Sequence, residues 1–459
     1  MSNPIDSRLS RGNPVAAGRS WLRTLKKNPF FRDAALLSSG SAIGLLFTLA
    51  VSTLLTRMYG PEDFASLGLF TSFLSVAGVG ATLQLETSIM SAADASEASY
   101  LALSAGCIGI PTSILAGLLL HLLIRNSLLG FGHLPWFVPI ALSLVMLFVG
   151  YFAVLRYWSL RKGSFREVSQ AVVVQSGARA IFQTLAGLVG LHNVGLILGE
   201  TLGRAFGMGR MFRSSWPELG RHAANFHWSE CRQTLARNWK FPILSFPSSL
   251  MDALCMNLAL PLLVQEYGAQ DGGYYALSWR VLALPSVLIT QAVADTFHNR
   301  IAVCVRESPA EVLSYFRRTS ISLLLAGSIP CLILVFWARP MFMLIFGAPW
   351  ASAGTMTALI APWYLAQFVV NPLSRVVLVL SGQETKLIWD LVCLVTVPSL
   401  FYVARLRRMG VFQTVGWLSV VSALLYVAYF AVLVVLLFRH HRTVVAPSRV
   451  NPGGGEAAG

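Results

Sequence analysis

Charged side chains are scarce in this sequence: Asp, Glu, Lys and Arg make up only 12% of its 459 residues, while hydrophobic residues make up 55%. Soluble domains carry about 25% charged residues, so this composition excludes an ordinary soluble protein. Acidic residues are fewest, with 20 against 35 basic ones. Several stretches of about 20 apolar residues are long enough to cross the hydrocarbon core of a bilayer as helices. The sequence therefore predicts an all-α polytopic membrane protein.

Cysteine pairs and enzyme motifs are equally sparse. The six cysteines show neither a CxxC pair nor the spacing of a zinc site, so we predict no disulfide and no metal. The sequence contains no P-loop, no HExxH motif and no nucleophile elbow. A membrane glycosyltransferase or polymerase needs a sizeable aqueous loop, and the predicted outer loops are all short. We therefore expect a protein that is not an enzyme and needs no cofactor, with a membrane enzyme as the weaker alternative.

A short pattern that occurs twice organises what is present. The residues Leu-Leu, Tyr-Gly and Asp recur at the same internal spacing in 54–63 and 262–271, 208 positions apart. A weaker echo, in which Phe-Gly precedes Pro-Trp, occurs in 131–136 and 346–350. Each copy of the first pattern lies between two apolar runs, as the tight link of a helical hairpin does. Repetition at about half the chain length is typical of transporters built from two related halves. We therefore predict two related lobes of one membrane domain.

About twelve transmembrane helices fit this division. A basic cytoplasmic N-terminal arm (1–35) precedes an N-lobe over 36–212, and a cytoplasmic inter-lobe linker (213–240) leads to a C-lobe over 241–438 and a disordered cytoplasmic tail over 439–459. Aromatic residues interleaved with the arm's charges suit a membrane surface, and a plain topology-setting tail is an equally good interpretation. The predicted spans are 36–56, 64–90, 100–123, 135–155, 168–190, 192–212, 241–264, 274–296, 319–338, 355–378, 387–404 and 411–438.

The distribution of basic residues predicts the orientation in the membrane. One side of the predicted topology holds 25 of the 35 lysine and arginine residues and the opposite side holds six. The positive-inside rule places the richer side, with both termini, in the cytoplasm. The loop with Arg405, Arg407 and Arg408 falls on the outer side and is either an exception or a sign that the last two spans are drawn wrongly. The positive net charge thus needs no nucleic-acid partner.

Polar side chains within the spans mark a candidate binding site, because a charge at membrane depth costs at least about 2.5–3.5 kcal/mol. Gln175, Arg179 and Gln183 recur at every fourth position and so share one helix face. A cavity lined by arginines and amides suits an anion, because guanidinium binds phosphate bidentately and amides hydrogen-bond sugars. The predicted cavity-lining residues for such an anion and its sugars are Arg179, Arg204, Arg280, Arg375, Gln175, Gln183, Gln367 and Asn371.

Three acidic residues are candidates for ion coupling or gating. Glu200 lies four residues before Arg204, so an intrahelical ion pair and a substrate contact are both open. Asp252 lies near the middle of its span, where it either pairs with an arginine of another helix or takes part in coupled ion movement. Glu86 is expected at the inner interface, where it would act as a gate or cap.

The segment Thr56–Phe64 resembles the first outer loop of bacterial Wzx-type polysaccharide-biosynthesis flippases, which belong to the MOP (MATE-like) exporter superfamily. The order and spacing of further segments strengthen this resemblance over 36–438. Ala65 departs from the family pattern, which often has glycine there, and Ala269-Gln270 weakens the second copy of the hairpin pattern. The similar segments are Leu83–Ile89, Gly195–Gly199, Phe241–Ser248, Gly273–Pro285 and Phe346–Trp350.

The resemblance implies a flippase of the bacterial inner (plasma) membrane with about twelve helices in two pseudo-symmetric six-helix lobes around a central cavity. Its expected substrate is an oligosaccharide on polyprenyl pyrophosphate, such as an O-antigen (lipopolysaccharide) or exopolysaccharide repeat unit, carried from the cytoplasmic to the periplasmic leaflet by alternating access. The expected partners are the bilayer, this lipid-linked substrate and, as an open possibility, a polysaccharide polymerase and a chain-length regulator. The alternative is a proton- or sodium-coupled multidrug or cation antiporter of the same superfamily, which would depend on Asp252 or Glu200.

Overall fold

The computed structural model describes residues 43–44, 47–48, 50–224, 227–285, 290–307, 311–380 and 383–445. Within these ranges the chain forms helices and no β-strand, which confirms the prediction of an all-α protein. The predicted arm over 1–35, residues 36–42, 45–46 and 49 of the first span, and residues 446–459 of the predicted tail lie outside the described residues. Among the described residues, seven helical stretches can cross a membrane by their length and composition: 95–125, 138–161, 241–267, 312–346, 348–373, 385–406 and 411–439.

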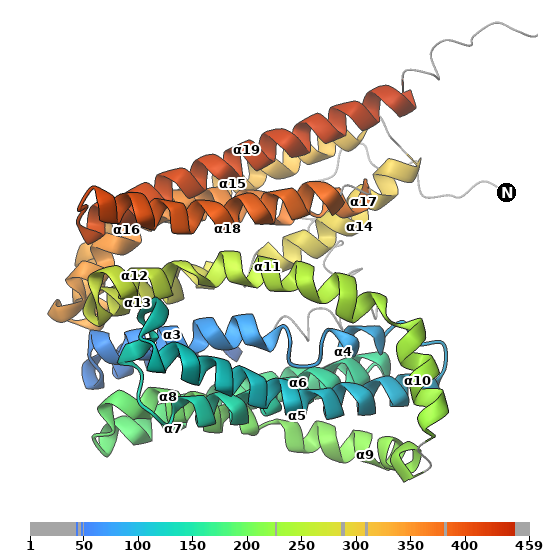
Figure 1. Cartoon of the computed structure of the whole chain (residues 1–459). Helices are drawn as coiled ribbons and strands as arrows, with labels where there is room; N and C mark the ends of the chain where they lie inside the picture. Colours follow the sequence, from blue (N-terminus) through green and yellow to red (C-terminus); the bar gives the residue numbers. More distant parts are fainter. Residues whose placement is uncertain are drawn as a thin grey trace, which may run out of the picture.

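Two groups of helices make up the molecule, and we refer to them as the N-lobe and the C-lobe (Figure 1). In the N-lobe, α5 packs on α6 and α7 on α8, while α3 contacts both α6 and α8. The N-lobe helices are α3 (Pro61–Gly78), α4 (Leu85–Ser88), α5 (Ala95–Arg125), α6 (Val138–Arg161), α7 (Phe165–Leu188) and α8 (His192–Ala205). The predicted lobe boundaries at 36–212 and 241–438 stay predictions.

In the C-lobe, α16 contacts α13, α15 and α19, and α18 lies against α11 and α19. The core around α16 is apolar and includes Trp350, Ile360 and Phe368. The C-lobe helices are η2 (Phe241–Ser245), α11 (Phe246–Asn257), α12 (Ala259–Tyr267), α13 (Ala269–Pro285), α14 (Gln291–Glu307), α15 (Val312–Phe346), η5 (Ala348–Trp350), α16 (Ala351–Leu373), α17 (Val376–Val379), α18 (Gln383–Leu406) and α19 (Val411–Val445).

The two ends of the helix bundle differ. We name the end with the links at Gly60 and Gly268 the hairpin end, and the opposite end, where α10 (Trp228–Arg237) lies, the linker end (Figure 1). The predicted linker over 213–240 is largely helical, because α9 (Met208–Ala224) and α10 occupy it. Both helices pack against α5, so the linker is a folded part of the molecule.

The repeated sequence pattern marks two helix links at the hairpin end. Gly60 precedes α3, and the backbone N–H of Gly60 donates to Asp63 Oδ2 at 2.9 Å. Pro61 starts the helix, where its missing N–H costs no hydrogen bond. In the second copy Gly268 ends α12 with φ 91°, a conformation that glycine adopts without strain. The pattern thus encodes the tight turns that join neighbouring helices.

Two predicted spans are interrupted in the structure, so their boundaries were wrong. The span over 64–90 ends at Gly78, and the turn that follows contains Leu83 and Gln84 at φ 51° and 64° before the short helix α4. The span over 192–212 breaks at Gly207, which has φ 83°. A Cβ at Gly207 would lie 2.6 Å from the carbonyl oxygen of Ala171, so the chain needs glycine there. Hydropathy alone does not reveal such breaks, because the apolar run continues through them.

The two lobes are in direct contact at the hairpin end. The indole Nε1 of Trp350 donates to the carbonyl oxygen of Thr56 at 3.0 Å, and its ring meets the ring of Phe64 edge-on at a centroid distance of 4.9 Å. The backbone N–H of Gly130 donates to Gln265 Oε1 at 2.7 Å. Helices α3 and α13 run so close that a side chain on Gly273 would overlap the backbone of Pro61.

Candidate functional site

A glycine face on α8 sets the geometry of the candidate site. Gly195, Gly199 and Gly203 recur at every fourth position and therefore lie on one side of the helix. A Cβ at Gly199 would lie 2.7 Å from the backbone nitrogen of Gln183, and one at Gly203 would lie 2.6 Å from that of Arg179. Small residues at this spacing let two membrane helices approach closely. Helix α7 accordingly lies directly against α8, with Arg179 beside the last glycine.

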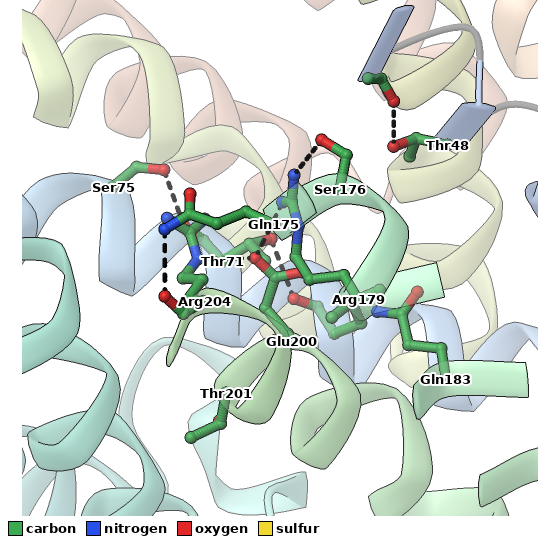
Figure 2. A network of polar contacts seen from close by, with 12 residues as sticks. Thr48, Thr71, Ser75, Gln175, Ser176, Arg179, Gln183, Glu200, Thr201 and Arg204 are labelled. Atoms are coloured by element: carbon green, nitrogen blue, oxygen red, sulfur yellow. Dashed lines mark hydrogen bonds and ion pairs between the residues drawn. The ribbon is translucent and has the colours of Figure 1, made fainter. Parts of the chain in front are cut away.

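This close packing places a buried carboxylate between two arginines (Figure 2). Glu200 is 6% exposed, and its Oε1 accepts from Arg204 Nε at 2.8 Å and from Arg179 Nη1 at 3.2 Å. The sequence left open whether Glu200 and Arg204 form an ion pair within the helix, and they do. The second pair was not expected, because it joins two helices. A carboxylate buried with two guanidinium partners is stabilised by charge-assisted hydrogen bonds.

Polar neighbours hold this cluster in place. Arg179 Nη2 donates to Ser176 Oγ at 3.2 Å, and Gln175 Nε2 donates to the carbonyl oxygen of Arg204 at 3.0 Å (Figure 2). Gln183 Nε2 donates to the carbonyl oxygen of Leu196 at 3.2 Å. Both glutamines therefore join α7 to α8. Neither lines the cavity described next, so any contact of theirs with a substrate stays a prediction.

A cavity of about 290 Å³ lies between the two lobes beside this cluster. Its N-lobe wall comes from α3, α7 and α8, and its C-lobe wall from α11, α12 and α13. Three of the predicted arginines line it: Arg179, Arg204 and the half-buried Arg280. Sequence reasoning missed the other polar and aromatic lining residues, because single hydroxyls and aromatic rings in an apolar span carry no distinctive signal. They are Thr48, Thr71, Ser72, Ser75, Asn257, Tyr275 and Trp279.

The charges of this cavity do not balance. Three arginines face it against one carboxylate, Glu200, which two of them share. Arg280 forms no ion pair with any other residue in the described ranges. The indole of Trp279 lies nearby, parallel to the ring of Tyr275 at a centroid distance of 6.3 Å. The site therefore offers an anion two net positive charges next to flat aromatic surfaces.

The predicted polar residues of α16 lie elsewhere. Gln367 Nε2 donates to Met256 Sδ at 3.6 Å, which places it behind a cavity-lining residue. Asn371 accepts a hydrogen bond from Ser374 through its backbone carbonyl, and Arg375 directly precedes α17. None of Gln367, Asn371 and Arg375 lines the inter-lobe cavity. Their predicted contact with a substrate stays untested.

A second charged cluster joins α11 and α18 in the C-lobe. Lys386 Nζ lies 3.3 Å from Asp252 Oδ1 and 2.7 Å from Asp390 Oδ2. Asp390 is 3% exposed, whereas the side chain of Asp252 is about half exposed. The sequence suggested an arginine partner for Asp252, and the structure shows a lysine instead. The spacing of Lys386 and Asp390, four residues apart on one helix, was the available signal for this cluster.

Glu86 lies at a break in the N-lobe, away from the cavity. It is 8% exposed and belongs to the short helix α4, where it accepts a hydrogen bond from the hydroxyl of Thr82. This contact closes the turn after α3, so a structural role is visible and a gating role stays a prediction. Within the described ranges, no group of three or more His, Cys, Asp or Glu side chains could hold a metal ion.

Comparison with solved structures identifies the fold. An inward-facing multidrug resistance MATE family transporter of the MOP superfamily superposes with a TM-score of 0.69 at 14% identity, covering 89% of this chain and 96% of that one. A MOP superfamily transporter from Pyrococcus furiosus gives 0.59 at 14% identity, covering 92% and 97%. A mutant of the Vibrio cholerae MATE transporter VcmN gives 0.57 at 16% identity, covering 92% and 98%. The predicted MOP/MATE-like fold is thereby confirmed.

The sequence itself identifies the family. No curated protein matches the chain significantly. A model of the family described as "Polysaccharide biosynthesis protein" matches residues 54–355, which is most of the chain and includes all the arginines of the inter-lobe cavity. The fold is one that membrane transporters of the MOP superfamily share, and several described helices are long and apolar enough to cross a bilayer. The chain belongs to the polysaccharide biosynthesis protein family and has the fold of MOP superfamily exporters.

Proposed function

We propose that this protein is a flippase that carries an oligosaccharide linked to polyprenyl pyrophosphate across the membrane. The observation that carries the proposal is the inter-lobe cavity with its three arginines and one carboxylate. A pyrophosphate diester is a compact anion, and guanidinium groups bind phosphate oxygens bidentately. The family match supports a polysaccharide precursor as the cargo. The O-antigen and exopolysaccharide repeat units are the two substrates we favour.

Each part of such a substrate has a matching part of the protein. Arg280, which has no ion-pair partner among the described residues, is placed to receive the pyrophosphate. Arg179 and Arg204 are held in fixed orientations by Glu200, so their remaining N–H groups are preorganised. Hydroxyls of α3 and the rings of Tyr275 and Trp279 suit sugar hydroxyls and sugar faces. The polyprenyl tail stays in the lipid between the lobes.

The position of the cavity between the lobes supports a mechanism in which the two lobes move relative to each other. The cavity of about 290 Å³ is walled by helices of both lobes, so it widens only if the lobes move apart. The lobes must therefore part to load the cargo, and the contacts at the hairpin end keep that end closed in this state. In alternating access the lobes rock around a central site, so the loading side of this state is the linker end.

Basic residues support a cytoplasmic position for the linker end. Arg161, Lys162, Arg237 and Lys240 lie around the linker and its neighbouring turn, as the positive-inside rule requires of a cytoplasmic face. The hairpin end then faces the periplasm, and the protein resides in the bacterial inner membrane. With this orientation cargo loads from the leaflet on which lipid-linked sugars are assembled.

Substitution of Arg280 tests the cavity assignment. Arg280→Ala removes the cavity's arginine that lacks a carboxylate partner, and glycan export is expected to fall at least about ten-fold, as for loss of one charge-assisted contact to phosphate. The matched control is Arg125→Ala, an exposed arginine at the end of α5 outside the cavity. Export of surface polysaccharide and lipid-linked intermediates is measured at equal protein level. Wild-type export by the Arg280→Ala variant would contradict the assignment of this cavity as the substrate-binding site.

A second function is favoured by the charged cluster of the C-lobe. Asp252 and Asp390 share one lysine, which leaves one negative charge that a proton or sodium ion can neutralise. Such a cluster fits an ion-coupled antiporter of the same fold, or ion coupling of the flippase itself. The MOP transporter from Pyrococcus furiosus is described as having a binding pocket of reverse polarity that suggests a different function, so pocket charge varies on this fold.

Deletion of the gene separates the two functions. The flippase predicts loss of surface polysaccharide, with lipid-linked repeat units retained on the cytoplasmic leaflet. The antiporter predicts unchanged polysaccharide and a greater sensitivity of the deletion strain to cationic dyes. Expression of the wild-type protein should then restore dye resistance, whereas the Asp252→Asn variant should not. Retained export together with normal dye resistance would contradict both.

A further inference from the structure

A long apolar groove runs along the C-lobe, away from the inter-lobe cavity. It has a volume of about 900 Å³ and is walled by α15, α16 and α19. Its lining is almost entirely hydrocarbon, with Leu324, Val369, Val427 and Phe430 as examples. Protein interiors and helix contacts normally leave few voids of this size. In a membrane such a groove is filled by hydrocarbon chains.

The groove has a polar mouth where α15 begins. A second, polar cavity of about 670 Å³ adjoins it and shares Ser314, Arg317 and Ile321 with it. The mouth also contains Arg300, Arg318 and one acid, Glu311. Within the described ranges none of its three arginines forms an ion pair. The mouth therefore offers two net positive charges beside hydroxyl groups of α15.

The spacing of charges along α15 fixes the depth of the groove in the bilayer. Arg318 and Arg339 are separated by 21 residues of helix, or about 31 Å, which equals the hydrocarbon thickness of about 30 Å. The mouth thus lies at the membrane surface of the linker end. Along α15 the groove extends about 10 Å, from Arg317 to Leu324. Along α19 it extends about 22 Å, from Phe438 to Ala423. One leaflet is about 15 Å deep.

The groove is distinct from the proposed transport route. None of its lining residues lines the inter-lobe cavity, which is walled by α3, α7, α8 and α11–α13. A lipid in the groove would therefore not be on the path between the lobes. Such a position suits a resident membrane lipid better than a cargo that must pass through the centre.

From this juxtaposition we propose that the groove of α15, α16 and α19 is a binding site for an anionic glycerophospholipid of the linker-end leaflet. The acyl chains fill the apolar groove, and the phosphate binds Arg317, Arg318 and Arg300 at the mouth. Charge complementarity selects anionic over zwitterionic headgroups. The inference does not depend on the cargo carried by the inter-lobe cavity.

Lipid binding to the purified full-length protein tests the proposal. Delipidated protein in detergent is titrated with phosphatidylglycerol or phosphatidylcholine, and bound lipid is counted by native mass spectrometry. Arg317→Ala/Arg318→Ala is expected to weaken phosphatidylglycerol binding about 25-fold, since each basic residue near a membrane surface contributes about five-fold. The control is Arg306→Ala, which removes one exposed arginine of α14 outside the groove and should bind as the wild type does.

A second variant separates the groove from its mouth. Ala366 lines the groove from α16, and Ala366→Phe fills it while leaving the three arginines in place. This variant is expected to lose the tight phosphatidylglycerol site. Equal phosphatidylglycerol affinity in the wild type, Arg317→Ala/Arg318→Ala and Ala366→Phe would overturn the proposal. Displacement of phosphatidylglycerol by undecaprenyl pyrophosphate, blocked by Ala366→Phe, would overturn it too, because the occupant would then be the cargo's own lipid.

Discussion

A disulfide across the hairpin end tests whether the lobes must part there. A Cβ built on Gly272 of α13 lies 3.6 Å from the Cβ of Ala65 on α3, within the range of about 3.5–4.5 Å found in disulfides. A methyl group of Val264 crowds that position, so the locked variant is Ala65→Cys/Gly272→Cys with Val264→Ala to make room. The six native cysteines are replaced by serine or alanine beforehand.

The magnitude follows from geometry. Once two cysteines are joined, their Cα atoms cannot separate beyond about 7 Å, so α3 and α13 cannot move apart to open the hairpin end. Each cross-linked molecule is then inactive, and the transport rate is expected to equal the fraction of molecules left unlinked. Flipping of a fluorescent polyprenyl-pyrophosphate glycan in proteoliposomes is measured against the cross-linked fraction, before and after a reducing agent.

A matched control isolates the effect of lobe separation. A Cβ on Gly150 lies 3.6 Å from the Cβ of Ala81, and both residues belong to the N-lobe. Ala81→Cys/Gly150→Cys therefore forms a bond of the same geometry that does not join the lobes, and it should leave transport intact. Full transport by fully cross-linked Ala65→Cys/Gly272→Cys protein would refute opening at the hairpin end, and with it the proposed rocking of the lobes.

Three further predictions concern the cavity and its supports. Glu200→Gln leaves Arg179 and Arg204 without their shared carboxylate and should lower the free energy of unfolding by about 2 kcal/mol, seen as a lower melting temperature; an unchanged value would mean that the pair is not stabilising. Gly203→Ala places a methyl group 2.6 Å from the backbone nitrogen of Arg179, so it should separate α7 from α8 and lower the melting temperature. The control Gly177→Ala meets open space and should not lower it. Equal melting temperatures of the two variants would contradict the close packing of α7 and α8. Trp350→Phe removes the hydrogen bond to Thr56, which contributes about 1 kcal/mol, and should shift the equilibrium about five-fold toward lobes that are open at the hairpin end. Distances between spin labels across that end measure the shift. Identical distance distributions in the wild type and the variant would exclude it.

The sequence predicted those features that a single segment encodes. The repeated Tyr-Gly pattern marked two helix links correctly, because glycine and proline at a turn act locally. Arginines in apolar spans indicated the cavity for a similar reason. The free-energy cost of a charge at membrane depth depends on the apolar segment in which it lies, and that segment can be recognised in the sequence. Arg179, Arg204 and Arg280 do line one cavity, although their role in binding a substrate stays a prediction.

Features that depend on how two helices meet were not predictable. The pair of Arg179 with Glu200 exists because glycines of α8 admit α7, and no periodicity in either helix alone specifies that contact. The amides of Gln175 and Gln183 share a face with Arg179, yet their hydrogen bonds go to the backbone of α8. Ala65, which departs from the family's usual glycine, is fully buried against α13.

For the proposed flippase, the unequal charges of the inter-lobe cavity have a consequence for how transport is driven. Three arginines against Glu200 leave two positive charges, which the two ionised oxygens of a pyrophosphate diester neutralise. The loaded protein would then turn without moving net charge, whereas the empty protein would return with two. An inside-negative potential supplies up to about 2.3 kcal/mol per charge per 100 mV to that return step. The membrane voltage alone would thus reset the transporter, and transport by proteoliposomes should rise with an imposed potassium diffusion potential at constant pH and sodium.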